Sequence, residues 1–126
     1  MSAQVEDDPV VNPFVLVVDD DRAFRGLAAR LLAGLGIGEV VQADSVASAL
    51  QAAEQFEPIA ALVDVGLPDG DGVELAALLL AATWAPRVVL TSSDTEAATR
   101  SGPIPFIAKD QLADGGLQTL LSGGGE

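Results

Sequence analysis

Residues 59–72 read IAALVDVGLPDGDG and join a short apolar run to a loop rich in glycine. The run stays uncharged until Asp64, which is typical of a strand buried on both faces of a parallel sheet. Pro68 stiffens the loop that follows, and the three glycines in it allow a sharp bend. A strand ending in an acid brings that carboxylate to the carboxyl edge of the sheet, where open α/β folds bind ligands. We therefore interpret Asp64 as the centre of the functional site.

The composition excludes several kinds of chemistry. Six basic side chains against 19 acidic ones give a formal net charge of −13, and such a field repels nucleic acids and anionic membranes. The chain has no cysteine and no histidine, which excludes disulfides, thiol nucleophiles and imidazole bases. We find neither a signal-peptide pattern nor an apolar run near the roughly 20 residues that span a bilayer. We therefore expect a soluble, cytoplasmic protein that contacts neither nucleic acid nor membrane directly.

Apolar runs and helical periodicity alternate along the chain. The expected strands cover residues 14–18, 39–43, 59–64, 87–91 and 105–108. Helical spacing covers residues 24–35, closed by Gly36, then a segment capped by Asp44 or Ser45, then 73–82, with a last helix within 110–121. Residues 94–100 make at most about two turns. Five strand–helix alternations predict a five-stranded parallel sheet with helices on both faces, an α/β fold.

This pattern indicates one domain with loose ends. We expect residues 1–12 to form a flexible acidic tail, residues 13–122 the folded domain, and residues 123–126 a frayed end.

Four polar features fall at the carboxyl ends of four expected strands: the pair Asp19-Asp20, then Asp64, Thr91 and Lys109, the sole lysine. Alone, each has an ordinary explanation. Acids cap helices, an Asp before a proline forms a turn, a threonine ends many strands, and a lysine is usually a surface charge. Parallel strands end at the same edge of the sheet, so together these residues should converge on one site.

In this order, the motifs resemble the receiver domain of two-component response regulators across residues 13–122. The resemblance rests on VLVVDDD (15–21), VDVGLPDGDG (63–72), VLTS (89–92) and FIAK (106–109). It implies the flavodoxin-like (βα)5 fold, a three-layer sandwich with a parallel sheet in the order 2-1-3-4-5.

The resemblance also implies roles for these residues. Asp64 would be the phosphoacceptor, Thr91 would hydrogen-bond a phosphoryl oxygen, and Lys109 would neutralise another and pair with Asp64 beforehand. Clustered carboxylates repel one another unless a cation joins them, and an open all-oxygen site suits Mg²⁺. The metal ligands implied by the family are Asp19, Asp20, Asp64 and the backbone carbonyl of Gly66.

Partners and output follow from the same resemblance. A histidine kinase or phosphotransfer protein would donate the phosphoryl group, and a downstream protein would bind the altered surface. Thr91 and Phe106 would form the switch, which relies on packing because phenylalanine has no hydroxyl. The chain would assist its own phosphorylation and dephosphorylation without being a turnover enzyme.

The sequence departs from the family in places. Asp110 follows Lys109 where many members have proline, and the segment between Thr91 and Lys109 is short and holds two prolines. We therefore expect helix four to be short or absent. One alternative is a pseudo-receiver that binds partners without phosphorylation. Another is a Mg²⁺-dependent phosphohydrolase using Asp19 and Asp21, but Asp20 and Arg22 fit that pattern poorly and the chain is short for such an enzyme.

Overall fold

The computed structural model describes residues 14–36, 39–83, 86–94, 99 and 102–114, and the predicted tails 1–12 and 123–126 lie outside them. Its centre is a five-stranded parallel sheet in the order β2-β1-β3-β6-β7, so the predicted order is confirmed. The strands are β1 (Phe14–Val18), β2 (Glu39–Ala43), β3 (Ala60–Asp64), β6 (Arg87–Ser92) and β7 (Phe106–Ala108).

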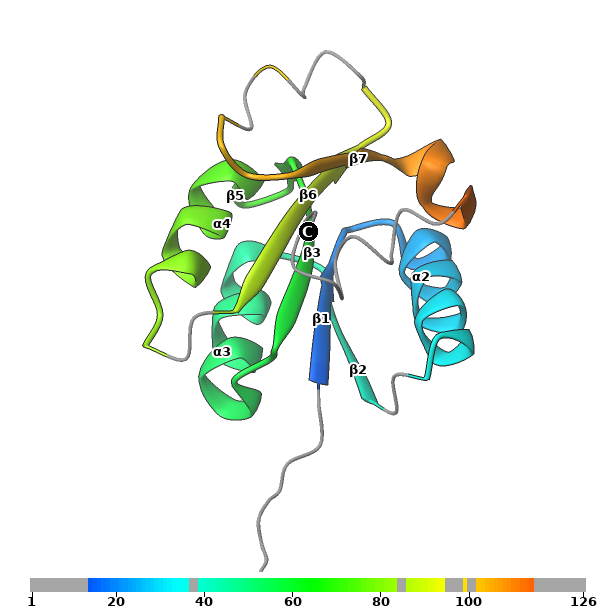
Figure 1. Ribbon diagram of the computed structural model, residues 1–126. Coiled ribbons are helices and arrows are strands. Elements are labelled where there is room, and N and C mark those ends of the chain that lie inside the picture. Colours follow the sequence, from blue (N-terminus) through cyan, green and yellow to red (C-terminus); the bar gives the residue numbers. More distant parts are fainter. Residues whose placement is uncertain (1–13, 37–38, 84–85, 95–98, 100–101, 115–126) are drawn as a thin grey trace, which may run out of the picture.

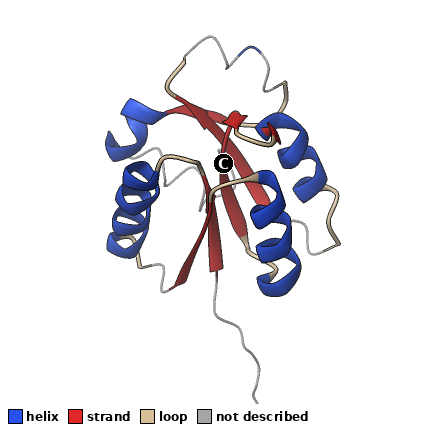
Figure 2. Ribbon diagram, turned by 180° about the vertical axis from the view of Figure 1, so that it is seen from behind, coloured by secondary structure: helices blue, strands red, loops and turns tan. Residues whose placement is uncertain are grey.

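Helices cover both faces of the sheet, giving the three layers seen in Figures 1 and 2. One face carries α2 (Arg22–Gly34) and the 3₁₀ helix η3 (Lys109–Asp114), while the other carries α3 (Val46–Phe56) and α4 (Gly72–Leu80). A two-stranded antiparallel hairpin, β4 (Gly66–Leu67) and β5 (Gly70–Asp71), lies between β3 and α4 in the chain. None of the described helices is both long enough and apolar enough to cross a membrane.

The alternation of side chains along each strand divides the core into two. Leu16, Val18, Val63 and Leu90 pack toward α3 and α4, whereas Val17, Leu62 and Val89 pack toward α2 and η3. Strands with apolar residues on both faces require a helical layer on each side, and this is why five short runs produce a sandwich.

Polar side chains set the start of each helix. Asp21 accepts hydrogen bonds from the N–H groups of Ala23 and Phe24 at the start of α2, and Asp71 does the same for Val73 at the start of α4. Ser45 caps α3 in a reciprocal arrangement with Ser48, which confirms one of the two predicted caps. Gly36 follows α2 with a φ of 95°, as expected of a glycine that closes a helix.

The predicted boundaries differ from the structure by a few residues at several element ends. Ile59 precedes β3 and is 40% exposed, so the strand begins one residue late. The helix predicted over 73–82 runs from Gly72 to Leu80, and Leu78 on its outer side is 57% exposed. The last helix, expected within 110–121, begins at Lys109 as a 3₁₀ helix, and residues 115–121 lie outside the described part.

The predicted shortening of helix four falls largely outside the described residues as well. Of residues 94–100, only Asp94 and Thr99 are described. The strand that follows, β7, lies at the edge of the sheet, as Pro105 predicted because proline cannot donate to a central ladder.

Candidate functional site

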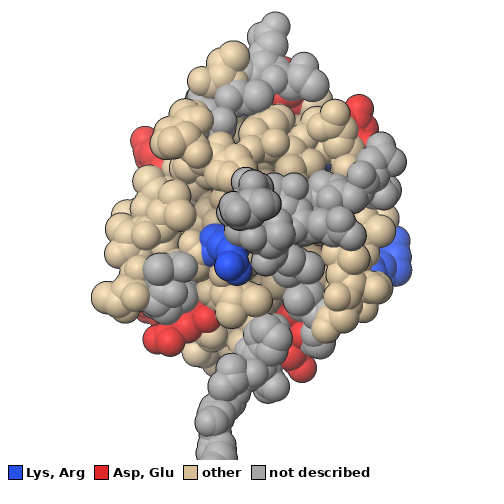
Figure 3. All heavy atoms as spheres, in the orientation of Figure 1, with Lys and Arg blue, Asp and Glu red and all other residues tan. Residues whose placement is uncertain are grey.

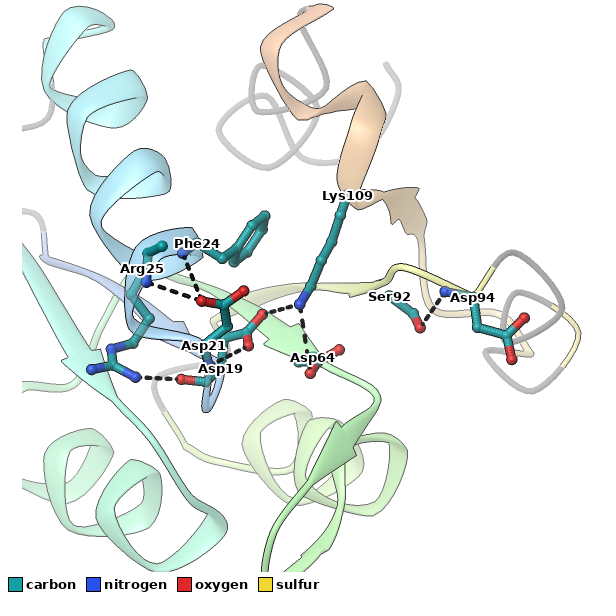
Figure 4. Close-up of polar contacts among 9 residues, drawn as sticks. Asp19, Asp21, Phe24, Arg25, Asp64, Ser92, Asp94 and Lys109 are labelled. Carbon is teal, nitrogen blue, oxygen red and sulfur yellow. Dashed lines mark hydrogen bonds and ion pairs between the residues drawn. The ribbon is translucent and has the colours of Figure 1, made fainter.

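Three of the predicted site residues, Asp19, Asp64 and Lys109, converge at the carboxyl edge of the sheet (Figure 4). Asp19 follows β1 directly, Asp64 ends β3, and Lys109 follows β7 and begins η3. Thr91 lies in β6, paired in register with Asp64. Parallel strands alone place these four residues together, as the sequence pattern predicted.

Asp19 is fully buried and held from several sides. Its backbone N–H donates to the carbonyl of Ala43 at 3.0 Å, and its carbonyl accepts from Arg25 Nη1 at 2.7 Å. Oδ1 of its carboxylate accepts from the N–H of Asp21 at 2.9 Å. Arg25 also donates from Nε to the side chain of Gln42 at 3.1 Å, so it ties α2 to β1 and β2 beneath the site.

Lys109 extends from η3 into the space between two carboxylates (Figure 4). Its Nζ lies 2.7 Å from Asp19 Oδ2 and 3.9 Å from Asp64 Oδ2, and its side chain is only 19% exposed. The pairing expected with Asp64 is therefore present, but the shorter contact is to Asp19. A carboxylate with no exposure to water gains most from a close cation, which accounts for this preference.

The surroundings of Lys109 keep it charged. Burial alone would lower the pKa of the ammonium group, but the hydrogen bond and charge of Asp19, with the charges of Asp64 and Asp21, outweigh burial and raise the pKa. The ring of Phe24 lies 4.6 Å from Nζ and adds a cation–π contact. Sequence reasoning missed this contact, because Phe24 has the spacing of an ordinary core residue.

Asp19, Asp20 and Asp64 form a carboxylate cluster. One oxygen from each lies within 4.8 Å of the others, with Asp19 and Asp64 buried and Asp20 exposed. Burial, together with the charges of Asp19 and Asp20, raises the pKa of Asp64 to about 6, although Lys109 and the N–H of Gly66 act in the opposite direction. Negative charge therefore exceeds what Lys109 compensates.

This cluster fits a hard divalent cation. Its ligands are carboxylate oxygens, and the exposed Asp20 leaves one side open to water, the arrangement that Mg²⁺ prefers. The backbone of Gly66 lies next to it, since its N–H lowers the pKa of the Asp64 carboxyl group. That its carbonyl is a fourth ligand stays a prediction.

Thr91 contributes a buried hydroxyl to the same edge. The residue is fully buried, and its Oγ1 finds no hydrogen-bond partner among the described residues. A hydroxyl buried without a partner is costly, and so it suits a group that arrives with an acceptor oxygen. Beside it, a cavity of about 320 Å³ is lined by Ser92, Ser93, Ala108, Lys109 and Asp110.

Gly72 fixes the backbone behind Asp64. A Cβ at position 72 would lie 1.9 Å from the carbonyl oxygen of Asp64, so no larger residue fits without displacing the strand end. The N–H of Gly72 donates to the carbonyl of Val65 at 2.8 Å, which closes the base of the β4–β5 hairpin. In the sequence analysis this glycine is only one of three that allow the loop to bend.

Asp21 is placed away from the role it would need in a phosphohydrolase. Its carboxylate caps α2 by accepting from Ala23 and Phe24, and it points to the helix rather than joining the cluster around Asp64. The Asp19–Asp21 pair therefore does not form a two-carboxylate catalytic site in this structure.

The comparison with protein families is decisive. The model of the response regulator receiver domain matches residues 15–118. The chain belongs to this family.

Curated relatives are receiver-containing proteins of several kinds. A protein-glutamate methylesterase/protein-glutamine glutaminase from Anaeromyxobacter dehalogenans is 42% identical over 86 residues, covering 67% of this chain and 25% of that protein. The KDP operon transcriptional regulatory protein KdpE of Escherichia coli is 33% identical over 111 residues, covering 85% of this chain and 48% of that protein. This receiver domain thus spans a quarter to a half of the length of these two relatives.

Solved structures show the same fold. Chemotaxis protein CheY4 of Vibrio cholerae superposes with a TM-score of 0.75 at 20% identity, covering 90% of this chain and 99% of that one. A response regulator of Burkholderia pseudomallei, solved with a phosphorylated aspartic acid, calcium ion and citrate, gives a TM-score of 0.72 at 26% identity, covering 86% and 66%. The flavodoxin-like receiver fold expected from the motifs is confirmed.

Proposed function

We propose that this receiver domain accepts a phosphoryl group on Asp64 from a histidine kinase or a phosphotransfer protein. The observation that carries this proposal is the buried pair Asp19 and Asp64 with Lys109 Nζ between them, 2.7 Å and 3.9 Å away. Phosphorylated aspartate in the Burkholderia pseudomallei relative supports it.

Phosphoryl transfer to Asp64 requires little more than correct positioning of the carboxylate and the phosphoryl group. A carboxylate oxygen of Asp64 attacks phosphorus, the bond from phosphorus to the donor's imidazole nitrogen breaks, and the bonding electrons return to that nitrogen. The products are an acyl phosphate on Asp64 and a free histidine on the donor. Such transfers depend mainly on alignment and on neutralising charge on the phosphoryl oxygens.

Residues of this chain supply that neutralisation. The ammonium of Lys109 is held beside Asp64 and would pair with one phosphoryl oxygen, and the hydroxyl of Thr91 would donate to another. Asp19, Asp20, Asp64 and the carbonyl of Gly66 would hold Mg²⁺, which when bound offsets the negative charge of the phosphoryl group and of the carboxylates.

The proposed output is a change of partner binding. Thr91 moving toward the phosphoryl group would open space behind it, and Phe106, half-buried in β7, would fill that space. The two residues lie on neighbouring strands, Thr91 on β6 and Phe106 on β7, which pair with each other.

We place the protein in the cytoplasm, binding a downstream protein, with no turnover activity and no direct contact with DNA or membrane. The face shown in Figure 3 has only scattered positive side chains, which agrees with the net charge of −13.

The proposal is tested by phosphorylation from a small-molecule donor such as acetyl phosphate. We expect the intact mass to increase by one phosphoryl group in the presence of Mg²⁺, and not after chelation of the metal. Asp64→Asn is the matched control, because it keeps the size of the side chain and removes the nucleophile. An unmodified wild type, or equal modification of the variant, would contradict the proposal.

The pseudo-receiver alternative gives a different result in a second assay. Beryllofluoride mimics the phosphoryl group on aspartate. If the affinity for a partner protein is the same with and without beryllofluoride, the domain works without phosphorylation.

A further inference from the structure

We propose that Asp69 is a positioning residue for the metal site, holding the β4–β5 hairpin to the N-terminus of α3. This inference rests on the proposed Mg²⁺ site. Asp69 accepts hydrogen bonds from two backbone N–H groups of α3, from Val46 to Oδ1 at 2.7 Å and from Ala47 to Oδ2 at 3.1 Å. These two contacts lower the pKa of Asp69, so the carboxylate is charged at neutral pH.

The contact joins segments that are distant in sequence but continuous with the site. Asp69 lies in the turn of the hairpin, between Leu67 and Gly70, which pair across β4 and β5. The opposite end of the hairpin is closed by the hydrogen bond from the Gly72 N–H to the Val65 carbonyl at 2.8 Å. The hairpin is therefore held at its base by β3 and at its tip by α3.

Gly66 lies between these two attachment points. It pairs with Asp71 in the hairpin, and its N–H acts on the Asp64 carboxyl group by lowering its pKa. The orientation of its carbonyl, which we assign to the metal, depends on the peptide planes on either side of it. Fixing the tip through Asp69 thus restricts the movement of the group that Gly66 presents to the cation.

Asp69 caps α3 from outside the helix, so its contacts join two segments, which a cap made within α3 does not do. Ser45 already caps the same helix, because its hydroxyl oxygen accepts a hydrogen bond from the Ser48 N–H at 3.1 Å. The hydroxyl oxygen of Ser48 in turn accepts one from the Ser45 N–H at 3.2 Å. Asp69 binds the first two N–H groups of the helix instead, from another part of the chain. Close packing reinforces the contact, since a Cβ at Gly70 would lie 3.0 Å from Val46 Cγ2.

The experiment compares two variants that each remove a cap from α3. Asp69→Ala removes the contact between hairpin and helix, whereas Ser45→Ala removes a cap made within α3. We expect both to lower the melting temperature. Only Asp69→Ala should raise the Mg²⁺ dissociation constant, by about 10-fold, the lower end of what residues behind metal ligands contribute. Titration calorimetry with MgCl₂ measures this constant.

A second readout needs no metal. In the Mg²⁺-free protein, the backbone amide protons of Gly66 and Leu67 should exchange faster in Asp69→Ala than in wild type, and at the wild-type rate in Ser45→Ala. Asp69→Asn, which keeps one acceptor oxygen, should lie between, and it serves if the alanine variant does not fold.

The outcomes separate this inference from the proposed function. If wild type binds no Mg²⁺ while Asp69→Ala alone speeds amide exchange, the proposed Mg²⁺ site is contradicted. The role of Asp69 in holding the β4–β5 hairpin is then still supported. If wild type binds Mg²⁺ and the two alanine variants have equal affinity and equal exchange rates, Asp69 is only a helix cap and the inference is overturned.

Discussion

At the scale of residues, the site places more negative charge from carboxylates near its centre than the ammonium of Lys109 neutralises. Asp19 and Asp64 are buried beside one lysine, and Asp20 adds a third carboxylate at the surface. One ammonium does not compensate three carboxylates, and burial, followed by the charges of Asp19 and Asp20, raises the pKa of Asp64 to about 6. The receiver domain without metal should therefore be destabilised by its own acidic site.

Asp64→Asn should stabilise the metal-free protein at pH 7. The pKa of Asp64 is about 6 in the folded state against 3.8 as the reference value. Above pH 6 the folded state carries the full cost of the buried charge, and below pH 4 both states are protonated and the cost disappears. At about 1.4 kcal/mol per pH unit, the variant should gain roughly 1–3 kcal/mol at pH 7. Urea unfolding in chelator at pH 7 and pH 4 measures this gain, and a difference independent of pH would contradict it.

Thr91→Val should also stabilise the metal-free protein. The side chains are nearly the same shape, and the change removes a buried hydroxyl for which no partner is found among the described residues. We expect a gain of about 1 kcal/mol in the free energy of unfolding, together with slower phosphorylation of Asp64. Thr91→Ser, which keeps the hydroxyl, is the control. A loss of stability in the valine variant would show that Thr91 Oγ1 has a partner.

At the scale of elements, the backbone that carries the site has little freedom. Gly72 begins α4 directly against the end of β3, and its place is set by the contact with the Asp64 carbonyl rather than by helix preference. The helix cannot approach the strand so closely with any larger residue.

Gly72→Ala should therefore be strongly destabilising, by about 3 kcal/mol or more, because its Cβ would lie 1.9 Å from Asp64 O. Gly26→Ala is the matched control. It lies inside α2, where the nearest atom to a new Cβ is 3.6 Å away, and alanine there should add about 0.5–1 kcal/mol. Thermal unfolding of the two variants distinguishes them, and similar effects would contradict the account of Gly72.

The elements themselves were largely predictable from the sequence, since five apolar runs became five parallel strands in the expected order. Asp19, Asp64, Thr91 and Lys109 were predictable as a group, because parallel strands end at one edge. The β4–β5 hairpin was not, because strands of two residues carry no periodicity.

Contacts between side chains were also beyond the sequence. Asp69 reaches Val46 across 23 positions, and nothing in the pattern of either segment signals this contact. The preference of Lys109 for Asp19 over Asp64 depends on side-chain rotamers, which a sequence pattern does not specify.

At the scale of the whole molecule, 19 acidic residues against 6 basic ones give a net charge of −13. Self-repulsion of this size destabilises the compact state and is relieved by salt. A general effect of salt must therefore be separated from specific binding of a divalent cation.

Mg²⁺ should stabilise the domain beyond the effect of NaCl at matched ionic strength. At ten times its dissociation constant, a ligand that binds only the folded state adds about 1.4 kcal/mol. Asp20→Asn should remove this specific gain while leaving the response to NaCl intact, since Asp20 is exposed and lies in the carboxylate cluster. Equal responses to both salts in wild type would argue against a metal site.

The central claim is that the acyl phosphate forms on Asp64, and borohydride trapping tests it most directly. Reduction of a phosphorylated aspartate gives homoserine, which peptide mass spectrometry assigns to a position. After incubation with a phosphodonor and Mg²⁺, we predict homoserine at position 64 alone, and none when Mg²⁺ is chelated. Homoserine at another aspartate, or none at any position, would contradict the account.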